Sequence, residues 1–264
     1  MSAADGALRD LTTLPKAHLH LHFTGSMRQQ TLLELAAERD IRLPRSLTDD
    51  VALQVEPTRR GWFRFQRQYD TARAVVDSEQ AMRRLLHEAA EDDAAEGSGR
   101  LELQVDPTSY APFVGGLTPA IEIVLDQAAR SERETGVSIG IVVAASRTRH
   151  PLDARTLARL AARHAGRVIG FGLSNDERRG TTADFGPAFR IAREAGLLAV
   201  PHGGELLGPS HVQDVVEHLG PHRLGHGVRA AEDPALLERV VDAGIGLELC
   251  PASNASLGVV ERAA

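Results

Sequence analysis

Short apolar segments alternate with helical patterns along the chain from residue 101 onwards. Most of these segments are rich in β-branched residues or leucine and are bounded by Gly, Pro or Asp, as buried strands commonly are. Such alternation predicts parallel strands joined by crossover helices. With one earlier segment included, strands are expected over residues 17–23, 101–106, 138–144, 168–173, 197–201, 223–225 and 246–250. Connecting helices are expected over residues 118–135, 153–164, 184–195, 209–219 and 234–243.

The region between the first and second strands is much longer than a loop between a strand and a helix needs to be. It carries helical patterns over residues 30–39, 61–76 and 78–96. We therefore expect a helical insertion over residues 26–98 that acts as a lid. Its aromatic residues Trp62, Phe63 and Phe65 either close over a ligand or pack in an ordinary helical core.

The length of the chain matches one large barrel domain. Its 264 residues are close to the roughly 250 of an α/β barrel, and no Ser- or Gly-rich linker marks a second domain. A closed barrel has eight strands, whereas the pattern provides seven before the sequence reaches Ala264. We expect residues 1–264 to form a single TIM-type (β/α)8 barrel that is truncated after the seventh strand, with the eighth strand missing.

Composition and charge exclude several classes of partner. The chain has 36 acidic and 30 basic residues, a net charge of −6, and its arginines are spread along the sequence. This balance gives no attraction to nucleic-acid phosphates. No stretch is apolar enough to span a membrane, no secretory signal is visible, and the single cysteine, Cys250, fits a reducing compartment. We expect a cytoplasmic protein that binds a small molecule, with no nucleic acid and no membrane; its oligomeric state is open.

Three histidines alternate with apolar residues in the first predicted strand. They are His18, His20 and His22. A strand has a side-chain period of two, so alternate residues point to one face. Two neutral imidazoles at i and i+2 on a rigid strand can hold one transition metal. The alternative interpretation is a solvent-facing polar stripe on an edge strand.

Polar residues also follow several later strands. The fifth strand leads into His202-Gly-Gly-Glu205 and the sixth into Gly225-His-Gly227. Taken singly, the first motif is as readily a tight turn with an incidental histidine and a surface glutamate, and the second is more simply a loop histidine. Gly172-Leu-Ser-Asn-Asp-Glu177 is alternatively a capped helix start, and Cys250 a small packed residue. Because barrel enzymes gather catalytic groups at the carboxyl ends of their strands, the set as a whole predicts an active site.

The order of these motifs resembles that of the adenosine deaminase family, which are metal-dependent amidohydrolase barrels. The resemblance runs from Leu14 to about Gly258. It rests on Pro15-Lys-Ala-His-Leu-His-Leu-His22, His202-Gly-Gly-Glu205, Gly225-His-Gly227 and Cys250-Pro-Ala-Ser-Asn254. It implies a small-molecule purine substrate, hydrolytic deamination of adenosine to inosine and ammonia in purine metabolism, and one Zn²⁺ per chain.

The resemblance also implies a metal-binding set. His20 and His22 match two ligands on the first strand of the family, and His202 matches a third ligand on the fifth strand. His18 precedes the pair and matches no ligand, so we expect a structural place for it.

Two catalytic and three substrate-binding positions follow from the same resemblance. Glu205 matches the glutamate that protonates the purine ring, and His226 matches the histidine that orients the attacking hydroxide. Gly204 matches a backbone position that lines the substrate. Thr24 stands where the family usually has an Asp that contacts the ribose, and Asn175 stands where a glycine often lies near the purine edge.

Departures from the family pattern leave two alternatives to adenosine deamination. Thr24 and Gln104, the latter where an Arg is common, motivate a deaminase of adenine or another 6-aminopurine derivative. In addition, the family carries an Asp-Asp pair on its eighth strand, and no such pair follows Asn254. On this basis we expect weak or absent activity for the chain as written. The second alternative is an inactive truncated fragment that binds a metal or a partner without turnover.

Overall fold

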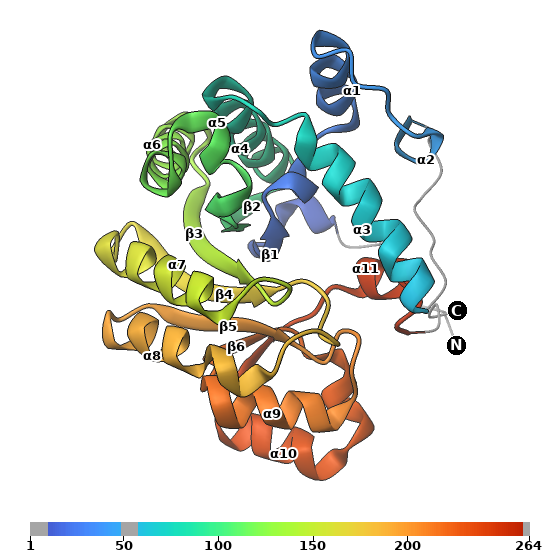
Figure 1. Ribbon diagram of the computed structural model, residues 1–264, viewed down its shortest axis with the longest axis vertical. Helices are drawn as coiled ribbons and strands as arrows, with labels where there is room; N and C mark the ends of the chain where they lie inside the picture. Colours follow the sequence, from blue (N-terminus) through green and yellow to red (C-terminus); the bar gives the residue numbers. More distant parts are fainter. Residues whose placement is uncertain (1–9, 49–57, 261–264) are drawn as a thin grey trace, which may run out of the picture.

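The barrel is built from seven parallel strands that are hydrogen-bonded in chain order (Figure 1). The computed structural model describes residues 10–48 and 58–260. Its strands curve into a nearly closed barrel, which confirms the predicted fold with seven strands in the described residues. They are β1 (Lys16–His22), β2 (Ser98–Val105), β3 (Ser138–Ser146), β4 (Val168–Ser174), β5 (Leu198–Gly203), β6 (Arg223–His226) and β7 (Gly246–Glu248).

Helices connect the later strands and cover the outside of the sheet. They are α6 (Leu117–Thr135), α7 (Pro151–Arg163), α8 (Gly186–Glu194), α9 (Pro209–Leu219) and α10 (Pro234–Asp242). Local signals set several of their ends: α9 and α10 begin at proline, and α6 and α9 end at a glycine in the left-handed conformation. The helix expected over residues 184–195 begins as a 3-10 turn, Thr182–Phe185, before continuing as α8. No helix of the described residues is long and apolar enough to cross a membrane.

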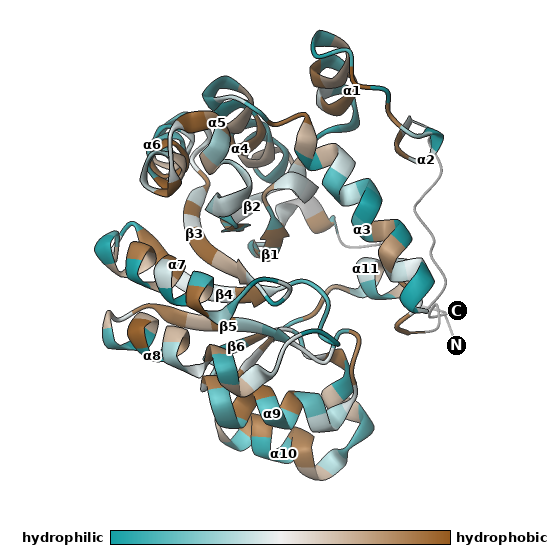
Figure 2. Cartoon of the chain, viewed as in Figure 1, coloured by the Kyte–Doolittle hydropathy of each residue, from teal (hydrophilic) through white to brown (hydrophobic). Residues whose placement is uncertain are grey.

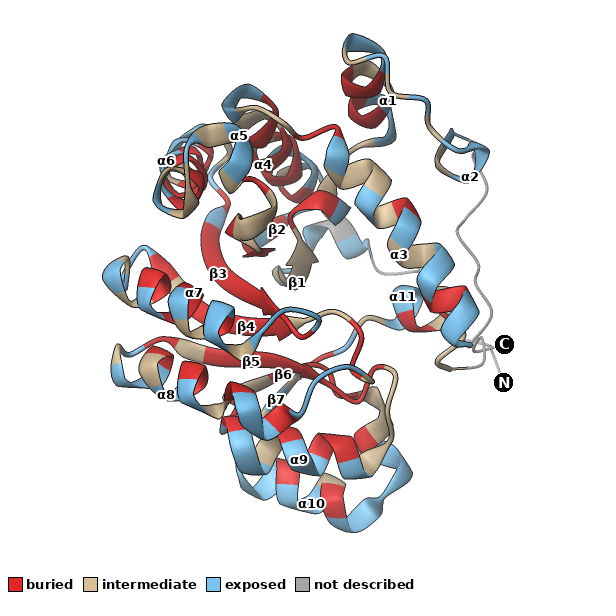
Figure 3. Cartoon of the chain, in the orientation of Figure 1, coloured by how far each residue is buried: buried red, intermediate tan, exposed pale blue. Residues whose placement is uncertain are grey.

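The core lies between the strands and this outer layer of helices. Figure 2 shows that apolar colour concentrates on the strands and on one side of each helix, and Figure 3 shows the same surfaces buried. Phe171 of β4 packs edge-on against Phe189 of α8, with ring centroids 5.1 Å apart, and both are fully buried. Burying a side chain of this size stabilises the fold by about 1.5–3 kcal/mol, so this contact helps to hold α8 against β4.

The segment between β1 and β2 divides into two parts. It contains α1 (Gln29–Glu38), α2 (Arg45–Thr48), α3 (Arg59–Ala74) and α4 (Glu79–Ala95). Helix α4 packs on β2 and α6 and buries Leu85 and Leu86 completely, so it belongs to the outer layer of the barrel. Helix α3 instead runs beside the barrel opening, as does α11 (Pro251–Ser256) (Figure 1). The proposed lid over residues 26–98 stays a prediction, and its residues 49–57 lie outside the described part of the chain.

Candidate active site

A large cavity lies at the carboxyl ends of the strands. Its volume is 1130 Å³. Each of the seven strands contributes a residue at or just beyond its end, and α3 and α11 contribute side walls. The strand residues include His22, Asp106, Ser146, Asn175, His202, His226 and Glu248. This is the edge at which barrel enzymes place their chemistry.

Three imidazoles converge in this cavity from opposite sides of the barrel. The Nε2 atom of His202 on β5 lies 3.1 Å from the Nε2 atoms of both His20 and His22 on β1. In a tetrahedral zinc site with Zn–N distances of about 2.0–2.1 Å, ligand nitrogens stand about 3.3 Å apart. The spacing and the all-nitrogen donor set therefore fit a single divalent transition-metal ion.

Burial keeps two of these imidazoles, His22 and His202, in the form that binds metals. Burial lowers the pKa of His22 and of His202 well below its usual value, and the neighbouring His20 lowers both further. Only a neutral imidazole offers a lone pair to a metal. The pocket therefore holds His22 and His202 neutral at physiological pH, ready to coordinate.

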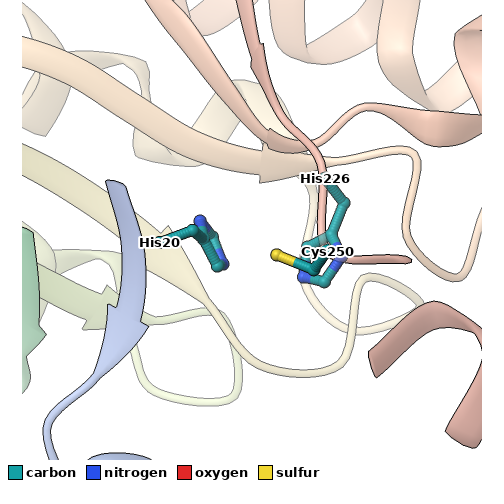
Figure 4. A group of neighbouring side chains, drawn as sticks. All are labelled: His20, His226 and Cys250. Atoms are coloured by element: carbon teal, nitrogen blue, oxygen red, sulfur yellow. The ribbon is translucent and has the colours of Figure 1, made fainter. Parts of the chain in front are cut away.

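A second group of potential ligands shares His20 with the first. It comprises His20, His226 and Cys250, which lie side by side with the sulfur directed toward His20 (Figure 4). Burial, together with the nearby Glu205 and Glu248, raises the pKa of the Cys250 thiol to about 11. The thiolate is the form that ligates metals, so a thiol held neutral is a poor donor. The three histidines of the first group are the better set.

His18 takes no part in either group. Strict alternation along β1 predicts that it shares a face with His20 and His22, but its Nδ1 atom lies 3.0 Å from Asp93 of α4. The pairing of β1 with β2 shifts register between His18 and Leu21, which breaks the simple alternation at this point. The hydrogen bond to Asp93 raises the pKa of His18. This is the structural role expected for it.

The histidine of the Gly-His-Gly motif stands in a strained turn that aims it into the cavity. His226 has a φ of 63°, in the left-handed region that non-glycine residues seldom adopt. Its Nδ1 atom lies 3.1 Å from Nδ2 of the buried Asn254, and its Nε2 atom 3.5 Å from Oε1 of Glu205. Burial lowers the pKa of His226 to about 3, so its ring is neutral at physiological pH.

Glu205 is a buried carboxyl group poised to act as an acid. It follows β5 in the turn after His202 and is 5% exposed. Burial raises its pKa to about 8, with the negative charges of Glu177 and Asp176 adding to the effect. Glu205 is therefore mostly protonated at neutral pH. A site with a neutral imidazole, a protonated carboxyl group and three convergent histidines suits metal-assisted hydrolysis.

Comparison with known proteins agrees with this geometry. The family model for adenosine deaminase matches residues 15–264. The chain belongs to the adenosine deaminase family. A protein of Streptomyces virginiae named as an adenosine/adenine deaminase is 61% identical over 256 residues, which are 96% of this chain and 76% of that protein.

Solved structures give the same family picture. An adenine deaminase from Arthrobacter aurescens superposes with a TM-score of 0.82 at 28% identity, over 93% of this chain and 74% of its own. An amidohydrolase from Burkholderia ambifaria, solved with bound Zn, has a TM-score of 0.83 at 23% identity. That alignment spans 99% of this chain and 73% of the other, and it shows the shared fold.

In this deaminase-family chain the position of Glu205 depends on Glu177, a residue to which the sequence alone assigns no role. One Glu177 carboxylate oxygen accepts a hydrogen bond from the backbone N–H of Glu205 at 3.1 Å. The other accepts from the N–H groups of Leu206 and Leu207, both at 2.8 Å. Three main-chain bonds to one buried carboxylate fix the turn after β5. The sequence motif at residues 172–177 predicts polar groups at a strand end, with Asn175 near the substrate, but it assigns no role to Glu177.

A buried arginine, Arg147, supports β5 at His202, and the sequence alone did not predict this role. Arg147 follows β3, is 2% exposed, and donates from Nη2 to the backbone carbonyl of His202 at 2.9 Å. Burial lowers the pKa of Arg147 to about 10, which still leaves the guanidinium charged. No local sequence pattern predicts the role of Arg147, because its hydrogen-bond partner is the main chain of a strand 55 residues away.

The three predicted substrate-binding residues have different surroundings in this deaminase-family chain. Asn175 lines the cavity with a φ of 80°. Thr24 is 4% exposed, and its hydroxyl lies 2.7 Å from that of Tyr110, which gives it a partner within the protein. Gly204 has a φ of 78°, and a Cβ there would stand 2.6 Å from Val212, so only glycine fits. Contact of these residues with a substrate stays a prediction.

Replacing Gly225 with alanine is expected to disturb the metal-binding set. A Cβ at this position would lie 2.7 Å from Cε1 of His20 and 3.1 Å from Nδ1 of His202, so both rings must shift. We expect metal affinity, measured by competition with a chelator, to fall by about 10- to 100-fold. Gly99→Ala on β2 is the matched control, because nothing lies within 4 Å of its Cβ. Equal affinity in the two variants would contradict the packing argument.

Proposed function

We propose that the protein is a zinc-dependent deaminase that hydrolyses adenosine to inosine and ammonia in purine metabolism. The observation that carries this proposal is the convergence of His20, His22 and His202 beside a buried, protonated Glu205. Membership of the adenosine deaminase family supports the reaction class. The three nitrogen donors and their spacing support zinc, although such donor sets also bind other divalent ions.

Each group in the cavity has a task that its environment supports. When bound, zinc supplies a nucleophile at neutral pH by lowering the pKa of water to about 7. Attack at C6 of a 6-aminopurine is easier when the ring nitrogen N1 is protonated, because the ring then accepts the displaced electrons. Glu205, with its raised pKa, is the group that can donate this proton. The neutral ring of His226 can orient the nucleophile by hydrogen bonding.

The cavity is large enough to admit a whole nucleoside. At 1130 Å³ it exceeds the range of about 300–1,000 Å³ of typical small-molecule pockets. The aromatic residues Trp62, Phe65 and Tyr69 of α3 line it, with ring centroids 5.4 and 6.2 Å apart along the helix. Such a wall suits stacking against a purine or its sugar. Free adenine is the alternative substrate, in keeping with the similar adenine deaminase from Arthrobacter aurescens.

Metal analysis and a paired substrate assay test this proposal. We expect one zinc per chain, and an ultraviolet assay at equal concentrations is expected to give a higher kcat/KM for adenosine than for adenine. A preference for adenine would replace adenosine as the substrate while keeping the chemistry. Zinc binding without turnover of either compound would favour the second alternative, an inactive truncated fragment that binds a metal.

A further inference from the structure

A chain of buried charges crosses the interior of the barrel and ends at one of the metal-binding histidines. Arg223 of β6 donates from Nη2 to Oε2 of Glu102 on β2 at 2.6 Å. Its Nε atom lies 3.1 Å from Oε1 of Glu248 on β7, in an ion-pair contact without hydrogen-bond alignment. The other oxygen of Glu248 lies 2.7 Å from Nδ1 of His20 on β1. The side chains of Glu102 and Glu248 are 6% and 1% exposed.

The burial of the Glu102 and Glu248 carboxylates is energetically unfavourable and therefore suggests a function. An unpaired carboxylate inside a protein costs several kcal/mol, and a paired one still seldom adds net stability. One carboxylate oxygen of Glu248 contacts Arg223, and the other contacts His20. Glu248 of β7 thus contacts the Nδ1 side of His20, whereas the Nε2 side of the same ring faces His202.

We propose that Glu248 is a positioning residue that holds His20 in the metal-binding orientation, and that Arg223 holds Glu248. A carboxylate beside Nδ1 can only accept a hydrogen bond, which favours a proton on Nδ1 and leaves the Nε2 lone pair for the metal. That Nε2 atom is the one that lies 3.1 Å from Nε2 of His202. The inference rests on the three-histidine metal site of the proposed function.

Gln104 of β2 is the competing candidate for this role. Its amide nitrogen lies 3.1 Å from the same Nδ1 atom of His20. An amide N–H can only donate to that atom, which would favour the opposite tautomer and direct a proton toward the metal. Glu248 is closer, carries charge and is itself held by a cation, so it controls the ring.

Zinc affinity of the purified chain tests the proposal. Competition with a chelator is expected to give a Kd about 100-fold higher for Glu248→Ala and about 10-fold higher for Glu248→Gln, whose amide oxygen still accepts a weaker bond. Gln104→Leu is expected to change the Kd less than either. The matched control is Glu88→Gln, which alters another buried carboxylate, bonded to Thr31 and Arg84 on the outer layer of the barrel. It is expected to leave the Kd unchanged.

A second measurement separates positioning from folding. In metal-free protein labelled with 15N-histidine, the His20 signal, assigned from its loss in His20→Asn, is expected to report a proton on Nδ1. Glu248→Ala and Glu248→Gln are expected to move that signal toward the Nε2-protonated form. A purely structural role would lower thermal stability without this shift.

The outcomes distinguish the two proposals. Wild-type protein that binds no zinc would overturn the three-histidine site itself, and with it the proposed function. Wild-type binding with an unchanged Kd and tautomer in the folded Glu248 variants would overturn only the role of Glu248. A larger loss of affinity in Gln104→Leu than in Glu248→Gln would likewise overturn it and transfer the role to Gln104.

Discussion

Replacing His202 with alanine is expected to release the metal and to reduce deamination by roughly a thousandfold or more. The Nε2 atom of His202 lies 3.1 Å from the Nε2 atoms of His20 and His22 on β1, so its loss leaves two donors on a single strand. A bound metal supplies several kcal/mol of transition-state stabilisation. At 1.36 kcal/mol for each tenfold change in rate, about 4 kcal/mol corresponds to that factor of a thousand.

Metal content and turnover of His202→Ala are to be measured on the same preparation. His87→Ala is the control, because His87 lies on α4, contacts Ser131 and does not line the cavity. The control is expected to keep both its zinc and its activity. Full zinc occupancy in His202→Ala would show that the zinc site does not include His202.

Replacing Glu205 with glutamine is expected to lower kcat by about 100- to 10,000-fold, the usual contribution of a general acid. Glutamine has nearly the same shape, but its amide cannot supply a proton to the purine ring. The zinc content is expected to stay unchanged, because Glu205 is not among the potential metal ligands of either group. Glu134→Gln, on the exposed side of α6, serves as the control. Undiminished activity in Glu205→Gln would remove Glu205 from the mechanism.

The pH dependence of the wild-type protein provides a second test of Glu205. Its pKa is raised to about 8, so the protonated and active form dominates below that pH. Activity is therefore expected to fall as the pH rises through about 8, when the carboxyl group loses its proton. The residual activity of Glu205→Gln is expected to lack this alkaline limb. A profile of kcat against pH for both proteins measures the difference.

Short sequence patterns predict most strands and long helices of the barrel. Buried parallel strands need apolar runs, and the run at residues 138–144 appears in the structure as β3. Amphipathic spacing and terminal glycine or proline likewise place the long helices to within a few residues. The short helices α2, α5 (Ala111–Val114) and α11 were not predicted, because four to six residues carry no periodic signal.

The site divides along the same line. Motifs at strand ends point to His20, His22 and His202, because a barrel brings the ends of its strands to one edge. Glu177, Arg147 and the contact of Glu248 with His20 could not be predicted in this way. Each acts on a group from another strand, 28, 55 and 228 positions away. Only the curvature of the sheet decides which of these distant residues meet.

The cradle formed by Glu177 has a consequence for how this enzyme can diverge. Because the carboxylate of Glu177 grips main-chain N–H groups alone, the identities of the side chains at Leu206 and Leu207 do not enter those bonds. These two side chains can therefore change in the course of evolution without disturbing the bonds that hold Glu205 in its place.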